Sequence, residues 1–275
     1  MFPELFSLGP FHLRTFGVTL AAAFLVGTWI SLGEARRRGI DETKLVNLVL
    51  VILVASILGA RGFYVATHPA ETAGDPLAFF RLWEGGLTLI GGFVAGTIAG
   101  FAYMKIAELP MGATADTVTP AVALGVAIAR IGCFLNGCCF GRPCDLPWGV
   151  HYPEGSPPDL VFPGQAVHPS QLYNALAFFA LFLLTLWFRR RLKGDGQLWW
   201  LFVILFALVR FPIDATRHYE TSAYVLRWAG GGLTDSELIG AVMLVVAVVL
   251  FVRSARAGRA PRADEEASGA PATRS

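Results

Sequence analysis

The sequence predicts an all-α, polytopic integral membrane protein with about seven transmembrane helices. Hydrophobic residues make up 55% of its 275 residues, charged residues only 15%, and the mean hydropathy is +0.56. The hydrophobic residues fall into runs of about 17–23 residues, the length that a helix needs to cross a hydrocarbon core of about 30 Å. This composition excludes a soluble domain, and a formal net charge of +2 gives no indication of a nucleic-acid partner.

Each predicted membrane segment is a hydrophobic run that ends in charged residues or in a Gly/Pro-rich loop. The segments cover residues 13–33, 45–67, 86–104, 115–133, 169–188, 197–213 and 234–252. The third carries Gly92, Gly96 and Gly100, a spacing that lets membrane helices approach closely. We assign residues 1–252 to one transmembrane domain and residues 253–275, rich in Ala, Gly, Pro and Arg, to a disordered cytoplasmic tail.

Positive charge is distributed unevenly between the loops. Leaving out Arg274 near the C-terminus, thirteen Lys and Arg residues follow the first, third, fifth and seventh segments, whereas four lie in the loops on the other side. Cytoplasmic loops carry the excess of Lys and Arg, so we expect the N-terminus outside and the C-terminus in the cytoplasm. The loop and arm at 134–168 then face the outer side of the membrane.

Three arginines, Arg61, Arg130 and Arg210, lie near the predicted outer ends of hydrophobic segments. A charged residue at the centre of a membrane helix costs about 2.5–3.5 kcal/mol on insertion scales, so it usually marks a polar site. Because a guanidinium group presents a planar fork of donors that fits a phosphate, the pattern predicts a shared site for an anionic ligand. Snorkelling to the interface and a structural ion pair with Asp214 are the alternatives.

Arg210 is followed by Asp214 and Arg217 at spacings of four and three residues. On a helix these residues share one face, although Pro212 can bend it. The carboxylate would then orient the arginine fork and partly neutralise it. The alternative is an interfacial Asp214–Arg217 pair without a functional role.

The stretch from Arg130 to Gly149 resembles the signature of the phosphatidylglycerol–prolipoprotein diacylglyceryl transferase family. The family pattern, roughly G-R-I-G-C/N-F-x-N-G-x-x-x-G-[RK], is matched by Arg130, Gly132, Phe134, Asn136, Gly137, Gly141 and Arg142. Three further stretches are similar to the family: Trp83–Gly92, His168–Tyr173 and Arg210–Arg217. The resemblance covers most of the chain.

The resemblance implies an enzyme of the bacterial cell (inner) membrane. Such an enzyme moves diacylglyceryl from phosphatidylglycerol to the lipobox cysteine of a prolipoprotein, forming a thioether. Its partners are therefore phosphatidylglycerol, the prolipoprotein signal peptide and the bilayer, and no metal or other cofactor is expected. We expect Arg130 and Arg210 to be catalytic and to hold the lipid phosphate. The expected substrate-binding residues are Arg130, Asn136, Gly141, Asp214, Arg217, His168 and Arg61.

The chain departs from the family at three polar positions. Several members carry a histidine proposed as a general base where this chain has Ile90, and Phe16 and Asn174 replace a tyrosine and a glutamate. The group that accepts the proton of the substrate thiol is therefore open. His168 is the next candidate, and nearby positive charge that lowers the thiol pKa is another. A lipid-binding or transporter-like paralogue that lost transfer is the alternative function.

All four cysteines lie within twelve residues, in the spacing C-x4-C-C-x4-C: Cys133, Cys138, Cys139 and Cys144. Common zinc sites have the spacing C-x2-C, so a metal site is not predicted. Counting alone leaves a packing role, a disulfide and a metal site open. The cluster also fits a membrane thiol-redox protein that acts on a quinone or a partner protein.

Reporter fusions test the predicted orientation. A fusion after Lys193 should report a cytoplasmic location and a fusion after Val167 an outer location, because the basic loops stay in the cytoplasm. Opposite signals would reverse the topology and move the arm at 134–168 to the cytoplasmic side.

Overall fold

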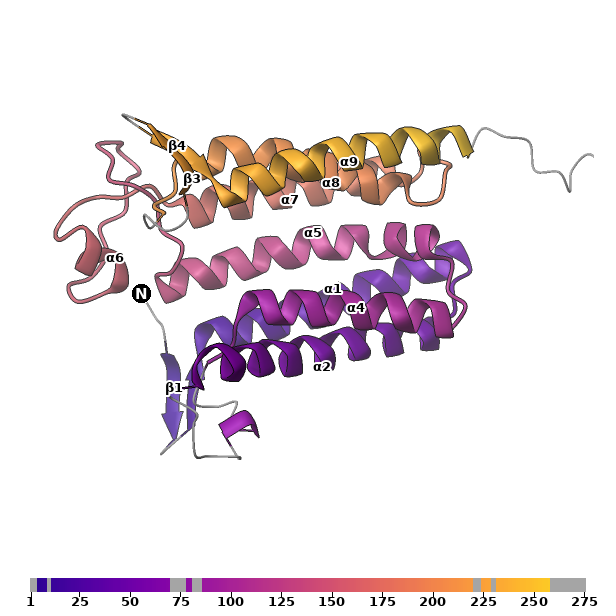
Figure 1. Ribbon diagram of the computed structural model, residues 1–275, viewed down its shortest axis with the longest axis horizontal. Helices are drawn as coiled ribbons and strands as arrows, with labels where there is room; N and C mark the ends of the chain where they lie inside the picture. Colours follow the sequence, from indigo (N-terminus) through magenta and orange to yellow (C-terminus); the bar gives the residue numbers. More distant parts are fainter. Residues whose placement is uncertain are drawn as a thin grey trace, which may run out of the picture.

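The computed structural model describes residues 4–8, 11–69, 78–80, 86–219, 224–228 and 231–257. Within these residues the protein is a bundle of long helices (Figure 1). Seven of the helices are long and apolar enough to cross a membrane. They are α1 (Thr15–Arg38), α2 (Glu42–Thr67), α4 (Leu89–Ile106), α5 (Met111–Asn136), α7 (Ser170–Phe188), α8 (Gln197–Asp214) and α9 (Asp235–Ala257).

The predicted membrane segments are confirmed, since each overlaps one of these helices. The largest differences are at the ends of α1 and α9, which continue to Arg38 and Ala257 beyond the hydrophobic runs. Arginines occupy the last turn of both helices, where a positive charge interacts favourably with the helix dipole. The remaining part of the predicted tail, residues 258–275, lies outside the described residues.

Two short antiparallel hairpins were not predicted. β1 (Glu4–Leu8) pairs with β2 (Phe11–Arg14) before α1, and β3 (Tyr224–Trp228) pairs with β4 (Gly231–Thr234) before α9. Strands of four or five residues are too short to give a periodic hydrophobic signal beside the membrane segments. The remaining short elements are η1 (Ala78–Phe80) and α6 (Pro157–Val161).

Helix α5 lies between two groups of helices (Figure 1). On one side it packs against α1, with α2 and α4 forming a tight pair beyond; on the other it packs against α7 and α8, and α9 covers α8. Small residues of α5, Ala123 and Ala127, allow the bulky Phe178 and Phe202 of α7 and α8 to fill the core between them. Helix α5 therefore carries contacts to both groups.

The predicted close approach of the glycine-rich helix is confirmed. Gly91, Gly92, Gly96 and Gly100 of α4 are buried against α2. A methyl group at Gly91 would collide with the backbone carbonyl of Gly59, which cannot rotate away as a side chain can, so glycine is favoured at this crossing.

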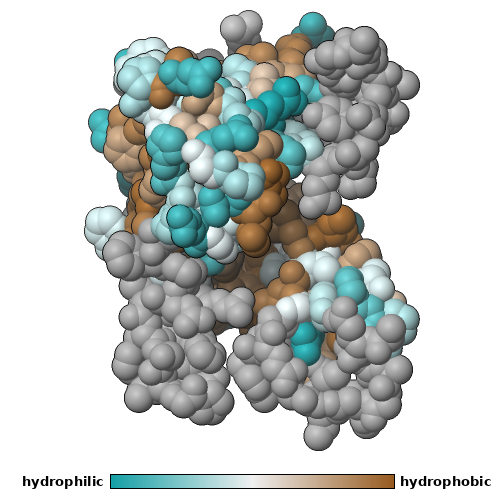
Figure 2. Space-filling view, turned by 90° about the vertical axis from the view of Figure 1, so that its left-hand side faces the viewer, coloured by the Kyte–Doolittle hydropathy of each residue, from teal (hydrophilic) through white to brown (hydrophobic). Residues whose placement is uncertain are grey.

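The two groups of helices separate at the end of the molecule that carries α6. Viewed onto this end, the molecule is hollowed between the two groups, and hydrophobic residues form much of the wall (Figure 2). The loops at the other end are the ones with the predicted cytoplasmic basic clusters. The hollow therefore opens on the predicted outer side.

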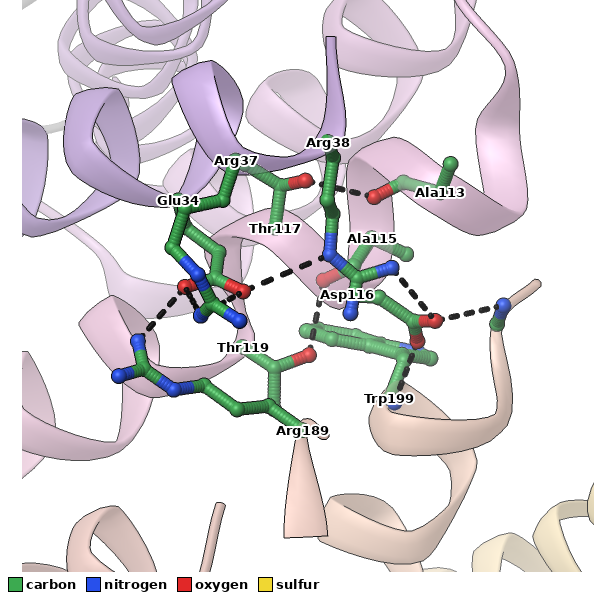
Figure 3. Close-up of polar contacts among 11 residues, drawn as sticks. Glu34, Arg37, Arg38, Ala113, Ala115, Asp116, Thr117, Thr119, Arg189 and Trp199 are labelled. Carbon is green, nitrogen blue, oxygen red and sulfur yellow. Dashed lines mark hydrogen bonds and ion pairs between the residues drawn. The ribbon is translucent and has the colours of Figure 1, made fainter. Parts of the chain in front are cut away.

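At the opposite end, two buried carboxylates join the groups (Figure 3). Glu34 of α1 accepts hydrogen bonds from Arg37 (2.8 Å) and from Arg189 at the end of α7 (2.7 Å). Asp116 of α5 pairs with Arg38 of α1 at 3.4 Å. Asp116 also accepts hydrogen bonds from backbone N–H groups at the start of α8, at 2.9 and 3.0 Å. This network holds four helices together at one end, while the other end stays open.

Replacing Glu34 with Gln should lower the free energy of unfolding by about 3 kcal/mol, because the change leaves several arginines without their buried counter-charge. This loss of stability is at the low end of the range for breaking a buried ion pair, because the arginines are partly exposed. The unfolding midpoint in detergent measures the effect. The matched control is Glu42→Gln, which removes an exposed pair with Arg36 and should change the midpoint little. Equal effects of the two variants would contradict this role of Glu34.

Candidate functional site

The end of α5 is set by a glycine of the signature. Gly137 caps the helix in the left-handed conformation, with φ of 73°, and its N–H donates to the carbonyls of Cys133 and Phe134. A side chain at this φ is disfavoured, so glycine is the residue that lets the chain turn here. Arg130 and Asn136 consequently lie in the last turns of α5, and both are partly buried.

The arm that follows α5 is held by backbone hydrogen bonds to the starts and ends of other helices. The N–H of Gly141 donates to the carbonyl of His168 (3.1 Å), and the N–H of His168 donates to Arg142 (3.0 Å). The N–H of Arg142 donates to Thr216, just after α8 (2.9 Å). A methyl group at Gly141 would collide with His168 and Ser170. Gly141 is thus required where the arm, α7 and α8 meet.

The start of α7 fixes the loop next to α5. Gln171 is buried, and its side-chain amide donates to the carbonyl of Cys138 (2.9 Å) and to the hydroxyl of Tyr152 (3.2 Å). The Nδ1 atom of His168 lies 3.3 Å from the hydroxyl of Tyr173, which accepts a hydrogen bond from the indole of Trp148. The HPSQLY motif therefore orders the loop and the arm through its side chains.

Asp214 is the centre of a buried charged network at the end of α8. One carboxylate oxygen lies 2.9 Å from Nε of Arg210, and the other accepts a hydrogen bond of 2.8 Å from the hydroxyl of Tyr219. Arg217 approaches the second oxygen at 3.8 Å. The predicted contacts of Asp214 with both arginines are confirmed. The predicted shared helix face is wrong for Arg217, because α8 ends at Asp214 and Arg217 lies in the turn that follows.

One buried donor of this network, on Arg217, is unused among the residues that the structure describes. The Nε atom of Arg217 is buried and has no hydrogen-bond partner among the residues that the structure describes. The side chain of Arg210 is 24% exposed, although its carboxylate partner is only 3% exposed. A buried donor without a partner is costly, so an anionic ligand that accepts a hydrogen bond here would be stabilised.

Three of the four cysteines come together beside these arginines. The sulfur atoms of Cys133, Cys138 and Cys139 all lie within 4.8 Å of one another. Hydrogen bonds with the thiols of Cys133 and Cys138 lower the pKa of the Cys139 thiol. The positive charges of Arg217 and Arg130 lower this pKa further. The three thiols and the two arginines therefore share one electrostatic environment.

Arg61 contacts residues of α2 and of the segment before α4. Its side chain is buried in the group formed by α2 and α4, donates to the carbonyl of Gly86 (3.3 Å) and lies over the ring of Tyr64. Glycine is required at position 86, because a methyl group there would collide with both side chains. Through these contacts, Arg61 joins α2 to the segment before α4.

The positions that depart from the family pattern have different surroundings. Ile90, in the first turn of α4, is 64% exposed, so a base at this position would reach the surface of the bundle. Asn174 is buried and donates to the carbonyl of Ser170 within α7. Phe16 lies in the first turn of α1. Residues 83–85 of the Trp83–Gly92 stretch lie outside the described residues.

Comparison with known proteins assigns the chain to a family. The family model described as prolipoprotein diacylglyceryl transferase matches residues 3–253. The chain is 33% identical over 248 residues to the phosphatidylglycerol–prolipoprotein diacylglyceryl transferase of Synechococcus sp. (strain CC9902), covering 88% of this chain and 89% of that protein. The chain belongs to the prolipoprotein diacylglyceryl transferase family.

Other members are similarly related. The phosphatidylglycerol–prolipoprotein diacylglyceryl transferase of Nostoc sp. (strain PCC 7120) is 36% identical over 224 residues, which is 78% of each chain. The protein of the same name from Clostridioides difficile (strain 630) is 30% identical over 247 residues, 90% of this chain and 93% of the relative. The family resemblance of the signature is therefore confirmed, and with it a multi-pass membrane protein.

Sequence reasoning missed several residues that build this transferase-family site. Tyr219 and Tyr152 donate or accept hydrogen bonds to Asp214 and Gln171, but each is a single tyrosine in a loop without a periodic pattern. The grouping of three cysteines was also missed, because it depends on the left-handed turns at Gly137 and Cys139. No signal in the spacing of the cysteines identifies such turns.

The variant Gly141→Ala tests whether the arm is held as described. The added methyl group collides with His168 and Ser170, so the arm should detach and become more sensitive to limited proteolysis. Gly33→Ala is the matched control, because a methyl group at Gly33 meets no atom within 4 Å. An arm equally resistant in both variants would contradict the proposed packing.

Proposed function

We propose that the protein transfers the diacylglyceryl group of phosphatidylglycerol to the lipobox cysteine thiol of prolipoproteins. The observation that carries this proposal is the group of Arg210, Asp214 and Arg217 at the open end of an apolar bundle, with Arg130 and Arg217 both acting electrostatically on Cys139. Membership of the family and the names of the relatives support the same reaction. A membrane-embedded cluster with excess positive charge suits the phosphate group of a lipid.

The proposed reaction is a substitution at the glyceryl carbon. The thiol sulfur attacks this carbon, the C–S bond of the thioether forms, and the C–O bond to the phosphate breaks. The electron pair of that bond leaves with the oxygen of glycerol phosphate, and the thiol proton is lost. Negative charge therefore develops at the phosphate, where arginine donors stabilise the transition state more than the ground state.

We assign the phosphate to Arg130 and Arg210, with Arg217 as a further donor. Asp214 fixes the guanidinium of Arg210 through Nε and lowers the net charge of the group, so that glycerol phosphate can leave after transfer. The unpartnered Nε of Arg217 supplies a buried donor that the ligand can satisfy. Asn136 lies at the end of the same helix as Arg130 and completes the proposed substrate contacts.

In this proposal, the remaining predicted residues hold the segments around the site in position. Gly141 and His168 hold the arm against α7 and α8, and Arg61 keeps α2 joined to the segment before α4. In a bacterial inner membrane with the N-terminus outside, the hollow would receive the lipid and the lipobox segment from the outer side. We place the transferase domain in residues 1–252, and α9 continues beyond this boundary to Ala257.

A transfer assay tests the function directly. Purified protein in detergent is incubated with phosphatidylglycerol and a lipobox peptide, and mass spectrometry detects the diacylglyceryl thioether. A peptide with Ser in place of Cys is the negative control. Binding of phosphatidylglycerol without any transfer would overturn the proposal and favour the lipid-binding paralogue. Thiol oxidation that is indifferent to Arg130→Ala would instead favour the redox protein.

Arg130→Ala and Arg210→Ala should each reduce the rate of transfer by about 10²–10³-fold, the usual cost of removing one donor from a developing negative charge. Lys at either position should restore little of the transfer activity, because an ammonium group lacks the planar fork of donors. Rates at saturating phosphatidylglycerol measure the effect. Arg36→Ala, at a largely exposed position in the far end of α1, is the control with full activity. Full activity of Arg210→Ala would contradict the phosphate assignment.

A further inference from the structure

The end of α5 has the hydrogen bonds of a Schellman motif. The N–H of Cys138 donates to the carbonyl of Cys133 (3.1 Å), and the N–H of Gly137 donates to the carbonyl of Phe134 (3.2 Å). Gly137 has the left-handed φ of 73° that is typical of this motif. In a Schellman motif, the side chain just after the left-handed residue commonly contacts a side chain of the last helical turn. The motif therefore brings position 138 against position 133.

Both of these positions are cysteines in this chain, so the contact joins two thiols. The sulfur atoms of Cys133, Cys138 and Cys139 lie within 4.8 Å of one another, and each cysteine is a free thiol in this structure. The sulfur of Cys138 lies 3.7 Å from the carbonyl oxygen of Cys133, so its side chain is turned back onto the helix. Because the sulfurs of a disulfide are about 2 Å apart, those of Cys133 and Cys138 need to approach by at most about 3 Å.

The geometry favours a bond between the helix and the loop over a bond within the loop. Neighbouring Cα atoms are about 3.8 Å apart across a trans peptide bond, whereas disulfides usually join Cα atoms about 4.4–6.8 Å apart. A bond between the adjacent Cys138 and Cys139 is therefore strained. Cys139 lies one residue beyond the position that the motif sets against the helix, and Cys144 is not part of the cluster. The pair selected by the fold is Cys133 and Cys138.

The backbone on both sides of this pair is fixed. Cys133 lies in the last turn of α5, and the carbonyl of Cys138 accepts a hydrogen bond of 2.9 Å from the buried side chain of Gln171 in α7. The two thiols differ in exposure, since Cys133 is buried and Cys138 is partly exposed. An oxidant in solution therefore reaches Cys138 first, and Cys133 reacts with it through the sulfur of Cys138.

The predicted orientation places this loop on the outer side of the membrane. Disulfides form and persist in oxidising compartments such as the bacterial periplasm, whereas thiols stay reduced in the cytoplasm. Two thiols that the fold holds in contact on this side of the membrane are in the environment that oxidises them.

We propose that Cys133 and Cys138 form a disulfide across the cap of α5, and that Cys139 and Cys144 stay free thiols. The oxidant is a disulfide, either a small molecule or a disulfide-bonded protein of the outer compartment. The thiolate of Cys138 attacks it and displaces one thiol, and the thiolate of Cys133 then attacks the sulfur of Cys138 and displaces the other. Two protein thiols lose two protons and two electrons, and the oxidant is reduced to two thiols. One bond forms per chain, and no substrate is oxidised.

The bond would hold the turn of the helix that follows Arg130. Arg130 precedes Cys133 by three residues, so the two side chains are neighbours on one face of α5. A covalent link across the Schellman motif keeps the last turn of the helix from opening. It thereby holds the loop against the helix end that carries Arg130. Because the bond closes a short ring, the expected stabilisation is at the low end for a disulfide.

Mass spectrometry of the full-length protein tests the bond. Free thiols are blocked with an alkylating reagent during cell lysis, and the protein is then purified without reductant. Two cysteines should be blocked, and fragmentation should show Cys133 linked to Cys138. Cys139→Ser and Cys144→Ser are the matched controls and should keep this link, whereas Cys138→Ser should leave three free thiols. Four blocked cysteines, or a native bond to Cys139 or Cys144, would overturn the proposal.

Thermal unfolding in detergent tests whether the bond holds the cap. Reduction should lower the unfolding midpoint of the native protein by about 5 °C, because the unfolded chain is no longer constrained. The same reductant should leave the midpoint of Cys138→Ser unchanged, and Cys144→Ser should respond as the native protein does. A native midpoint that does not respond to reduction, or an equal response of Cys138→Ser, would overturn this role. Neither measurement uses a lipid or peptide substrate, so the result is independent of the transfer assay.

Discussion

The buried carboxylate of Asp214 is the interaction on which the rest of the site depends. Arginines at membrane depth repel one another and are costly to desolvate, so a cluster of them needs a negative charge within reach. Asp214 supplies one charge for Arg210 and Arg217, and Tyr219 satisfies a further lone pair. The single carboxylate leaves the group positively charged. That remaining charge makes the site receptive to a phosphate, whereas full neutralisation would make it a structural ion-pair network.

Both ends of the bundle contain buried carboxylates in contact with arginines, but one end is closed and the other is open. At the end of Glu34 and Asp116, carboxylates accept hydrogen bonds from arginines and backbone N–H groups, and four helices are held together. At the end of Asp214, the helix groups separate around a hollow. Buried arginine Nε atoms lack a hydrogen-bond partner among the described residues at both ends, Arg38 and Arg189 at the closed end and Arg217 at the open end. Because the end with Glu34 and Asp116 is held together, the arginines of α5 and α8 at the other end keep their positions relative to one another. They do so even though the bundle is open to a lipid there.

The sequence predicted the helices and the charged residues of the site well, for a physical reason. Long hydrophobic runs and isolated arginines are strong signals, because both follow from the cost of placing polar groups in a bilayer. Features that depend on short-range geometry were not predicted, such as the hairpins before α1 and α9 or the position of Arg217 beyond the end of α8. The contacts of Arg61 with Gly86 and Tyr64 also needed the structure, because they depend on how the segment before α4 returns to α2.

The exposed Ile90 bears on how the substrate thiol is activated. A general base typically contributes about 10²–10⁴-fold, and isoleucine contributes none of it. Positive charge from Arg130 and Arg217 lowers the pKa of a nearby thiol, but the same charge is needed by the phosphate once the lipid is bound. The two demands conflict if arginines serve both. Ionisation of the substrate thiol and binding of the phosphate therefore compete for the same positive charge in this chain.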